Sequence, residues 1–214
     1  MSIEEIAKQM VAKGKGILAA DESTGTMEKR LKNVGVECTE KNRLHFRETL
    51  FSSTSMKSSI SGVILFDETI RQTASSGISI PDLIKKSGSI PGIKVDKGAK
   101  ILAGSDQEKI TEGLDGLRAR MEEYYKLGAR FAKWRAVYSI SSKYPSEQCI
   151  KSNAHALARY AALDQEAKMV PIVEPEVLMD GDHSIDQCHE VCLLYTSDAA
   201  DEGLGVDLGG RRII

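Results

Sequence analysis

The chain has 214 residues, of which 28% are charged and 41% hydrophobic. This composition is typical of a globular protein with one domain, and it excludes a chain dominated by disorder. The formal net charge of -2 provides no overall attraction to nucleic acid or to an anionic membrane, so we expect neither as a partner.

Targeting signals and cysteine usage bear on the compartment. No stretch approaches the roughly 20 apolar residues that a bilayer span requires, and the N-terminus lacks the apolar segment of a signal peptide. The four cysteines contain no Cys-x-x-Cys pair, which favours structural thiols in a reducing compartment over a disulfide or zinc framework. They are Cys38, Cys149, Cys188 and Cys192. We therefore expect a cytoplasmic protein.

The first half of the chain alternates helical and strand patterns. Ile3, Ile6 and Met10 recur at helical spacing, and glycines near residue 14 separate this first helix from an apolar strand at 17–20. A second apolar run at 62–66 is bounded by polar residues, as in a strand buried on both faces. A third strand is predicted near residue 92.

The clearest helical pattern lies at 107–127. Its apolar residues step by four, three, four and three: Ile110, Leu114, Leu117, Met121 and Tyr124. Gly128 stands where a C-terminal cap belongs. A strand at 131–138, a helix at 150–161 and a strand at 170–174 follow.

Five predicted strands separated by helical sequence indicate a parallel α/β fold with right-handed crossovers. No Gly-x-Gly-x-x-Gly follows the first strand, and no Walker-type loop is present. Their absence weakens the case for a doubly wound nucleotide-binding sheet. We therefore predict a (β/α)8 TIM barrel.

Charged residues lie in or next to the last three predicted strands. They are Lys94 and Asp96, then Lys133 and Arg135, then Glu174 and Glu176. Alternate residues of a strand share a face, so each pair points the same way. The carboxyl ends of barrel strands form the reaction site, and the first strand ends there with Asp21. A structural ion pair explains any single charge equally well, whereas a shared site better explains all six.

Lysines and carboxylates in one partly dry pocket shift one another's pKa values, which is how a lysine becomes neutral enough to attack a carbonyl. This favours carbonyl or phosphate chemistry. Asp21-Glu-Ser-Thr24 fits a helix N-cap cluster as well as a catalytic site, and Arg30 and Arg43 are by default solvated helix charges. The segment 180–183 with His189 lacks a closed ligand set, so we predict a turn and helix cap there, and no metal.

Six segments, taken together and in order across residues 1–191, carry a resemblance to a known family. They are Gly16-Ile-Leu-Ala-Ala-Asp-Glu-Ser-Thr-Gly25, Gly62-Val-Ile-Leu-Phe66, Gly92-Ile-Lys-Val-Asp-Lys-Gly98, Thr111 to Gly116, Phe131-Ala-Lys-Trp-Arg135 and Val170-Pro-Ile-Val-Glu-Pro-Glu176. The chain resembles the class I, or Schiff-base, fructose-bisphosphate aldolases.

The resemblance implies a TIM-barrel lyase of glycolysis and gluconeogenesis. Such an enzyme reversibly cleaves fructose 1,6-bisphosphate, a sugar bisphosphate, into dihydroxyacetone phosphate and glyceraldehyde 3-phosphate, with no metal or other cofactor. By matching motif, the catalytic residues would be Asp21, Lys133, Glu174 and Glu176. The substrate-binding residues would be Lys94, Arg135, Arg43, Ser23, Thr26 and Arg30. For the full-length family member, the resemblance also implies a homotetramer and possible cytoskeletal partners.

The end of the chain departs from the family pattern. The resemblance places the Schiff-base lysine on a sixth strand, but the last lysine here is Lys168. Residues 192–214 resemble nothing in the family, and we expect the preceding helix not to continue beyond Val191. We therefore expect a partial barrel at 1–191, truncated after about five strands, and a tail at 192–214 produced by a frameshift or a linker.

The predicted consequence is an aldolase fragment without the iminium-forming lysine, and therefore without activity. Two other functions remain open. One is a non-catalytic binding or scaffold protein derived from the aldolase fold. The other is a different Schiff-base barrel enzyme such as a transaldolase, against which the long motif matches count.

Overall fold

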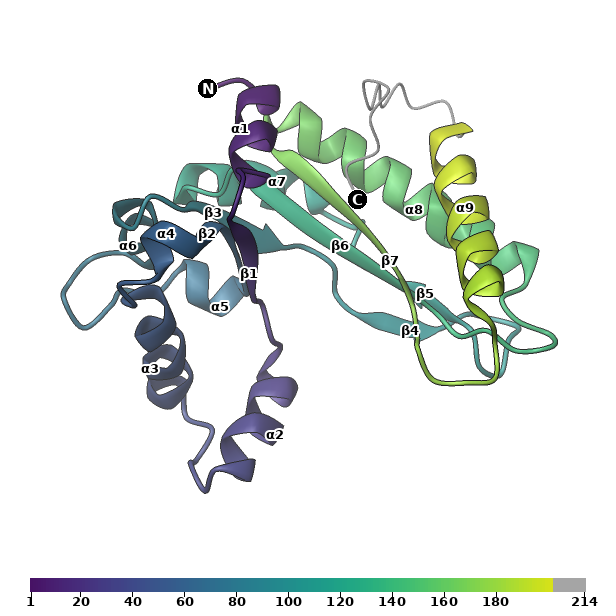
Figure 1. Cartoon of the computed structure of the whole chain (residues 1–214), viewed down its shortest axis with the longest axis horizontal. Helices are drawn as coiled ribbons and strands as arrows, with labels where there is room; N and C mark the ends of the chain where they lie inside the picture. The colour runs from purple at the N-terminus through teal and green to yellow at the C-terminus, as the bar shows by residue number, and fades with distance from the viewer. Residues whose placement is uncertain (202–214) are drawn as a thin grey trace. The chain divides into compact units, whose positions relative to one another are not determined.

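The computed structural model describes the backbone of residues 1–201 and the side chains of residues 1–194 (Figure 1). The strands are β1 (Gly16–Ala20), β2 (Ile60–Leu65), β3 (Ile90–Lys94), β4 (Ala99–Ile101), β5 (Lys109–Thr111), β6 (Phe131–Tyr138) and β7 (Val170–Val177). The helices are α1 (Ile3–Met10), α2 (Thr24–Asn33), α3 (Glu40–Phe51), α4 (Met56–Ser59), α5 (Asp67–Ile70), α6 (Ile80–Lys86), α7 (Leu117–Leu127), α8 (Glu147–Glu166) and α9 (Ile185–Asp201). Of the predicted tail, residues 202–214 lie outside the described residues.

The strands form one five-stranded sheet in the order β1-β2-β3-β6-β7, and β4 and β5 form a separate antiparallel hairpin. The pairs β1–β2, β2–β3 and β3–β6 are parallel. A doubly wound sheet reverses its strand order at a switch point, whereas this sheet adds each strand on the same side as the one before. When every strand is added on the same side by a right-handed crossover, all the connecting helices lie on one face of the sheet, and the other face becomes the interior of a barrel. The five predicted strands and the α/β class are confirmed.

The described chain divides into two compact units. The first contains Met1–Lys94, Ala119–Lys133 and Ala167–Val170, and the second contains Val95–Arg118, Trp134–Glu166 and the chain from Pro171 onward. The first unit therefore holds β1, β2 and β3 with the start of β6. The second holds the hairpin, the end of β6, α8 and most of β7.

Helix α1 forms as its sequence predicts. Ser2 and Glu5 make a reciprocal capping box that satisfies backbone N–H groups at the helix start. Ile6 and Met10, one turn apart, are buried. The Ser61 hydroxyl at the start of β2 donates a hydrogen bond of 2.6 Å to the Met10 carbonyl, which ties the end of the helix to the sheet.

Phe131 fills a space that two glycines leave on neighbouring strands of the first unit. Its side chain is fully buried. A Cβ atom at Gly92 would lie 2.5 Å from Phe131 Cε1, and one at Gly62 would lie 3.1 Å from the same atom. Lys94 and Lys133 follow Gly92 and Phe131 by two residues, so they lie on the same sheet face, next to this ring along the strands.

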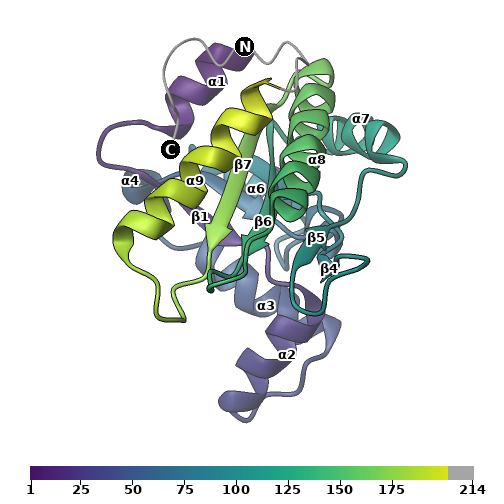
Figure 2. The ribbon, with the colours of Figure 1, turned by 90° about the vertical axis from the view of Figure 1, so that its right-hand side faces the viewer.

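An aromatic pair organises the core of the second unit. Trp134 on β6 stacks on Tyr160 of α8, with ring centroids 5.6 Å apart. The Tyr160 hydroxyl donates a hydrogen bond of 3.2 Å to the Ile172 carbonyl of β7. Helix α9 lies beside α8 (Figure 2). Helix α8 thus contacts β6 and β7, two strands that carry predicted site residues.

The prediction of a helix over 107–127 is wrong for nearly its first half. Lys109–Thr111 is strand β5, which pairs with β4, and α7 begins only at Leu117. Gly113 and Gly116 have φ values of +133° and +66°, which a right-handed helix does not accommodate. The predicted helix end is right, because Gly128 follows α7 with a φ of +112°.

The expectation that helical structure ends at Val191 is also wrong. Helix α9 continues to Asp201. No proline or glycine interrupts residues 192–201, and alanine and leucine within them favour a helix. The chain ahead of α9 matches the predicted turn and cap, since the Ser184 hydroxyl accepts a hydrogen bond of 3.2 Å from the Gln187 N–H.

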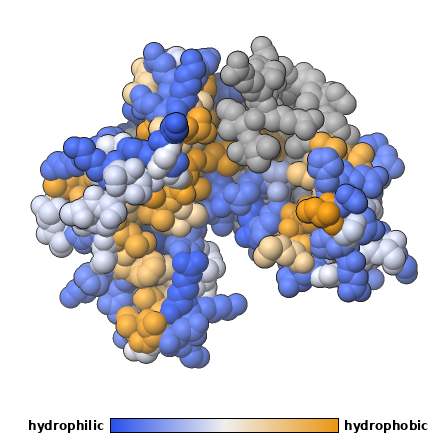
Figure 3. All heavy atoms as spheres, in the orientation of Figure 1, coloured by the Kyte–Doolittle hydropathy of each residue, from blue (hydrophilic) through white to orange (hydrophobic). Residues whose placement is uncertain are grey.

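Among the helices that the structure describes, none has both the length and the apolar character needed to cross a bilayer. The surface does carry local hydrophobic groups. Figure 3 shows one over the turn between α2 and α3, where Val34 and Val36 are 71% and 40% exposed.

Candidate active site

Asp21, just after β1, and Lys133, the third residue of β6, meet within the first unit. Asp21 follows Ala20, the last residue of β1 that pairs with β2. Lys133 lies on β6 and is in register with Lys94 of β3. The Lys133 Nζ donates to Asp21 Oδ2 at 3.4 Å, and the two side chains are only 11% and 13% exposed. A cation and a carboxylate are thus held together where little water screens them.

Helix α2 and its N-cap carry three of the predicted substrate-binding residues. Ser23 is the N-cap, and its hydroxyl accepts a hydrogen bond of 3.4 Å from the Thr26 N–H. The Ser23 and Thr26 hydroxyls are 3.1 Å apart. Arg30, one turn further, pairs with Glu22 at 2.5 Å. The N-cap interpretation of this segment is therefore confirmed, and it is compatible with Asp21 serving in a site.

Arg43 of α3 is paired with a carboxylate, contrary to the default expectation of a solvated charge. Its Nε and Nη2 donate to the two Glu68 oxygens at 3.0 and 2.6 Å, and its Nη1 donates to the Cys38 carbonyl at 2.8 Å. The Glu68 hydrogen bonds raise the pKa of Arg43 above its ordinary range. Glu68 lies in α5, directly after β2, so this pair also lies at the carboxyl end of a strand.

Sequence reasoning assigned no role to Glu22 and missed Glu68 and Arg47 at this end of the first unit. Arg47 is completely buried, and its guanidinium lies 3.8 Å from Glu22 Oε2 and 3.9 Å from Glu68 Oε1. Two signals were available in the sequence. Arg47 follows Arg43 by one helical turn, and Glu68 closely follows the apolar run at 62–66.

The second unit brings Arg135 and Glu176 together. Arg135 Nε forms an ion pair with Glu176 Oε2, and both side chains are about two-fifths exposed. The Thr111 hydroxyl of the hairpin donates to the Arg135 carbonyl at 2.8 Å, and Asn153 Oδ1 accepts from the Thr111 N–H at 3.2 Å. The β6 backbone at Arg135 is therefore held by a hydrogen-bonded chain from α8.

Glu174 lies two residues before Glu176 on β7, on the same face of the strand. Its charge acts on Tyr160, whose hydroxyl bonds to the carbonyl two residues earlier on β7. Burial raises the pKa of Tyr160 well above its usual value, and the carboxylates of Asp164, Asp96 and Glu174 add to this effect. Tyr160 therefore stays a neutral hydrogen-bond donor at any physiological pH.

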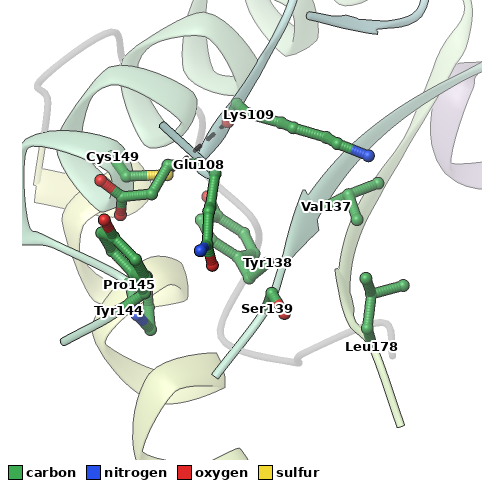
Figure 4. A pocket seen from close by; sticks show the side chains of 10 residues that line it. Glu108, Lys109, Val137, Tyr138, Ser139, Tyr144, Pro145, Cys149 and Leu178 are labelled. Carbon is green, nitrogen blue, oxygen red and sulfur yellow. Dashed lines mark hydrogen bonds between the residues drawn. The ribbon is translucent and has the colours of Figure 1, made fainter. Parts of the chain in front are cut away.

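A pocket of about 190 Å³ lies within the second unit (Figure 4). It is lined by Gln107, Glu108, Lys109, Val137, Tyr138, Ser139, Tyr144, Pro145, Cys149 and Leu178. Val137 and Leu178 follow Arg135 and Glu176 by two residues, so the pocket continues the strand faces that carry this ion pair. Sequence analysis identified none of the lining residues as a functional candidate.

The chemistry of the pocket wall is set by Glu108 and Cys149, whose side chains lie close together in Figure 4. Glu108 accepts hydrogen bonds of 2.6 and 2.8 Å from the Ser146 N–H and hydroxyl at the start of α8. Burial, with the Glu108 charge as the next contribution, raises the pKa of the Cys149 thiol to about 11. Cys149 is therefore a thiol without nucleophilic character at neutral pH.

The predicted site residues thus gather in two groups, each within one unit. In the first unit, Asp21 contacts Lys133, and Lys94 of β3 is in register with Lys133. In the second unit, Arg135 pairs with Glu176. Within each group, a cation of β6 lies next to a carboxylate, which follows β1 in the first unit and belongs to β7 in the second. Their catalytic roles stay predictions.

Comparison with known families identifies the family to which this chain belongs. The family model for class-I fructose-bisphosphate aldolase matches residues 2–196. The chain belongs to the class-I fructose-bisphosphate aldolase family.

Individual relatives agree. The chain is 60% identical over 194 residues to a protein of Xanthomonas campestris named "Probable fructose-bisphosphate aldolase class 1". The aligned region covers 89% of this chain and 58% of that relative. It is 54% identical over 191 residues to fructose-bisphosphate aldolase B of Gallus gallus, covering 89% of this chain and 52% of that relative. The chain therefore spans just over half the length of the curated relatives it matches.

A solved structure supports the fold. The aldolase of Plasmodium falciparum, in a complex with TRAP and a small-molecule inhibitor, matches with a TM-score of 0.89 and 45% sequence identity. The match covers 94% of this chain and 60% of that chain. It confirms the predicted class, a (β/α)8 barrel of which the described residues contain five strands.

Proposed function

We propose that this chain is part of a Schiff-base aldolase that reversibly cleaves fructose 1,6-bisphosphate into dihydroxyacetone phosphate and glyceraldehyde 3-phosphate. The observation that carries the proposal is the Asp21–Lys133 pair, with Lys94 of β3 in register with Lys133. Membership of the aldolase family supports the same reaction. In this class, a ketone carbon condensed with a lysine amine accepts the electrons of the breaking carbon–carbon bond.

The residues of this chain would supply the proton transfers of that reaction. Forming and hydrolysing an iminium requires an acid that protonates the departing oxygen and a base that takes up protons. We assign the main acid/base role to Glu174, with Glu176 beside it. Asp21 would act on the substrate hydroxyls near the bond that breaks, and Lys133 would hold the opposite charge beside it.

Binding a bisphosphate requires cations and hydrogen-bond donors at two ends of the substrate. Lys94 of β3 and Arg135 of β6 would supply positive charge, as a point charge and as a planar fork respectively. The start of α2 adds backbone N–H groups and the Ser23 and Thr26 hydroxyls, which suit a phosphate. Arg30 and Arg43 would exchange part of their contact with Glu22 and Glu68 for the phosphate.

The iminium-forming lysine is not among the assigned residues, because none of the lysines up to Lys168 matches its motif. We propose that it is absent from this chain, and that the 214-residue chain alone does not turn over. We also propose that the barrel sequence ends near Val191 and that residues 192–214 are an artefact of a frameshift or linker. The native transcript, resequenced downstream of Val191, tests this: an intact gene that encodes this tail would refute it.

The function is tested with two proteins assayed side by side. The first is the 214-residue chain, for which we expect no cleavage of fructose 1,6-bisphosphate in a coupled assay. The second is a chimera in which the remaining length of the Xanthomonas campestris relative follows the matched region, for which we expect cleavage. In the chimera, Glu174→Gln should lower kcat by about 100-fold or more, as loss of a general acid/base does.

Two outcomes would contradict the proposal. Borohydride trapping of the substrate on Lys94 or Lys133 in the 214-residue chain would show that another lysine forms the iminium. A folded chimera without cleavage would contradict the proposed reaction itself.

A non-catalytic binding role is the second candidate. The solved Plasmodium falciparum relative is in a complex with TRAP, so the fold can engage a protein partner. Cytoskeletal partners, a homotetramer for the full-length protein and a cytoplasmic location belong to the same proposal, and one Arabidopsis relative is named as cytosolic. A pull-down in which the chain retains a partner but cleaves no substrate would favour this role.

A further inference from the structure

Arg47 is a buried cation that the proposed chemistry does not use. Its side chain has no exposed surface, although it lies on α3, a helix whose other buried residue is Phe51. An isolated charge in such a place is costly unless it is paired or well hydrogen-bonded. The position of Arg47 therefore requires an explanation in its contacts.

The hydrogen bonds of Arg47 go to the segments that follow two adjacent strands, the turn after β1 and helix α5 after β2. Nη2 donates to the Glu22 carbonyl at 2.6 Å, just after β1, and Nη1 donates to the Thr69 hydroxyl at 2.7 Å, just after β2. Thr69 is itself fully buried. One planar guanidinium therefore links the ends of two neighbouring strands at fixed angles.

Nearby carboxylates offset the charge of Arg47, although none forms a short ion pair with it. Burial lowers the pKa of Arg47, while Glu22, Glu68 and Asp21 oppose the decrease. The Glu22 and Glu68 oxygens are 3.8 and 3.9 Å away, and these two residues make shorter contacts with Arg30 and Arg43. The short bonds of Arg47 are thus the ones to the Glu22 backbone and to Thr69.

The hydrogen bond from Arg47 to the Glu22 carbonyl bears on the position of Asp21, the residue before Glu22. The paired register of β1 with β2 ends at Ala20 and Leu65, so Asp21 lies just beyond the last residue that the sheet holds. Ser23 already caps α2, which leaves two residues between strand and cap. Arg47 bonds to the second of these, one peptide away from the carboxylate that meets Lys133.

We propose that Arg47 is a positioning residue that fixes the turn after β1 and thereby keeps the Asp21 carboxylate on Lys133. The inference deepens the proposed aldolase function and relies on it for the role of Asp21. In this arrangement, α3 contributes to the site without contacting substrate. Removal of the guanidinium releases Asp21 from Lys133 while the sheet remains.

The test measures the Asp21–Lys133 contact directly, without substrate. The chain is treated with a short pulse of acetic anhydride at fixed pH, and acetylation of Lys133 is quantified by peptide mass spectrometry relative to the exposed Lys85. A neighbouring carboxylate favours the unreactive ammonium form of a lysine, so Asp21→Asn should accelerate Lys133 acetylation by roughly threefold or more. Arg47→Met should give a similar increase.

The double variant separates positioning from general stability. In Asp21→Asn/Arg47→Met, the second substitution should add nothing, because the contact is already lost. Arg71→Gln is the matched control: it removes an arginine that pairs with Asp67 at the surface of the same unit, and it should leave Lys133 unchanged. Circular dichroism confirms that each variant is folded at the assay temperature.

Two results would overturn the inference: a wild-type Lys133 rate in folded Arg47→Met, or effects of the two substitutions that multiply in the double variant. Where Arg47→Met does not fold, Arg47→Lys decides. It keeps a buried charge but replaces the two-nitrogen fork with one ammonium, so an increased Lys133 rate supports the inference and an unchanged rate refutes it. Because no step involves substrate, failure here leaves the cleavage result of the chimera standing, and the reverse also holds.

Discussion

Gly92→Ala tests the packing beneath the candidate site. The new methyl group would lie 2.5 Å from Phe131 Cε1 and closer still to Cε2 and Cζ. Carbon atoms in contact lie about 3.5 to 4.0 Å apart, so the ring or the strand would have to move by roughly 1 Å or more. Phe131 is fully buried, and the Cε1 and Cζ atoms of its ring also lie close to Gly62 on the neighbouring strand. Overpacking of this kind typically costs about 1 to 3 kcal/mol, and we expect a value near 3 kcal/mol.

Urea unfolding of matched variants measures this cost. Gly62→Ala places its methyl group 3.1 Å from the same ring, so it should cost about 1 kcal/mol or less. Phe131→Leu removes the atoms that clash, so Gly92→Ala/Phe131→Leu should be more stable than the sum of the two single changes implies. Equal midpoints for Gly92→Ala and Gly62→Ala, together with additive effects in the double variant, would refute the explanation.

Three further predictions concern titrating groups. Because the pKa of Cys149 is raised to about 11, iodoacetamide at pH 8 should alkylate it at least about tenfold more slowly than Cys38, and Glu108→Gln should accelerate it. Because burial keeps the pKa of Tyr160 well above its usual value, Tyr160→Phe should leave the ultraviolet titration of the native chain unchanged up to about pH 11. Burial tends to raise the pKa of Asp67, but the hydrogen bonds from Arg71 and Tyr124 outweigh it and lower this pKa. The ionised carboxylate therefore stabilises the fold at pH values above the pKa of Asp67 in the unfolded chain, and this stability is lost as the pH falls below about 4. Asp67→Asn should reduce that loss of stability on acidification.

Strand positions were predictable because a buried parallel strand has a simple sequence signature. The predicted range of β6, 131–138, equals the observed one, and each charged pair falls on or just beyond its expected strand. The regular spacing of Lys94, Lys133 and Glu174 reflects one strand and one helix per unit of a barrel. Local alternation therefore sufficed to find the site-bearing strands.

The hairpin was not predictable from the same kind of pattern. Ile110 and Leu114 continue the helical steps of α7 by coincidence, but Ile110 pairs with Lys100 in the β4–β5 ladder. The Thr111 N–H bonds to Asn153, 42 residues later in the chain. A periodicity over a short window contains no information about such a distant acceptor, so the tertiary contact overrides the local helical preference.

The partners of the arginines were hidden for the same reason. Arg43 meets Glu68 across 25 residues, and Arg47 meets the Glu22 carbonyl across the same separation in the opposite direction. Solvated charges on a helix were the reasonable default, because most arginines on helices are exposed. These two arginines differ because their turn of α3 faces the turn after β1 and helix α5 after β2, and only the fold reveals that.

The packing of Phe131 and the chemistry of Lys133 are linked by their two-residue separation on β6. The same sheet face is filled by a ring and two glycines at one level and carries two lysines at the next. The ring is fully buried, and the Lys133 side chain, next to it along the strand, is only 11% exposed and pairs with Asp21. Gly92→Ala should therefore do more than destabilise the chain: by displacing the ring it should also shift Lys133, so acetylation of Lys133 should change in the folded variant. An unchanged rate, despite a large loss of stability, would mean that the two layers are mechanically independent.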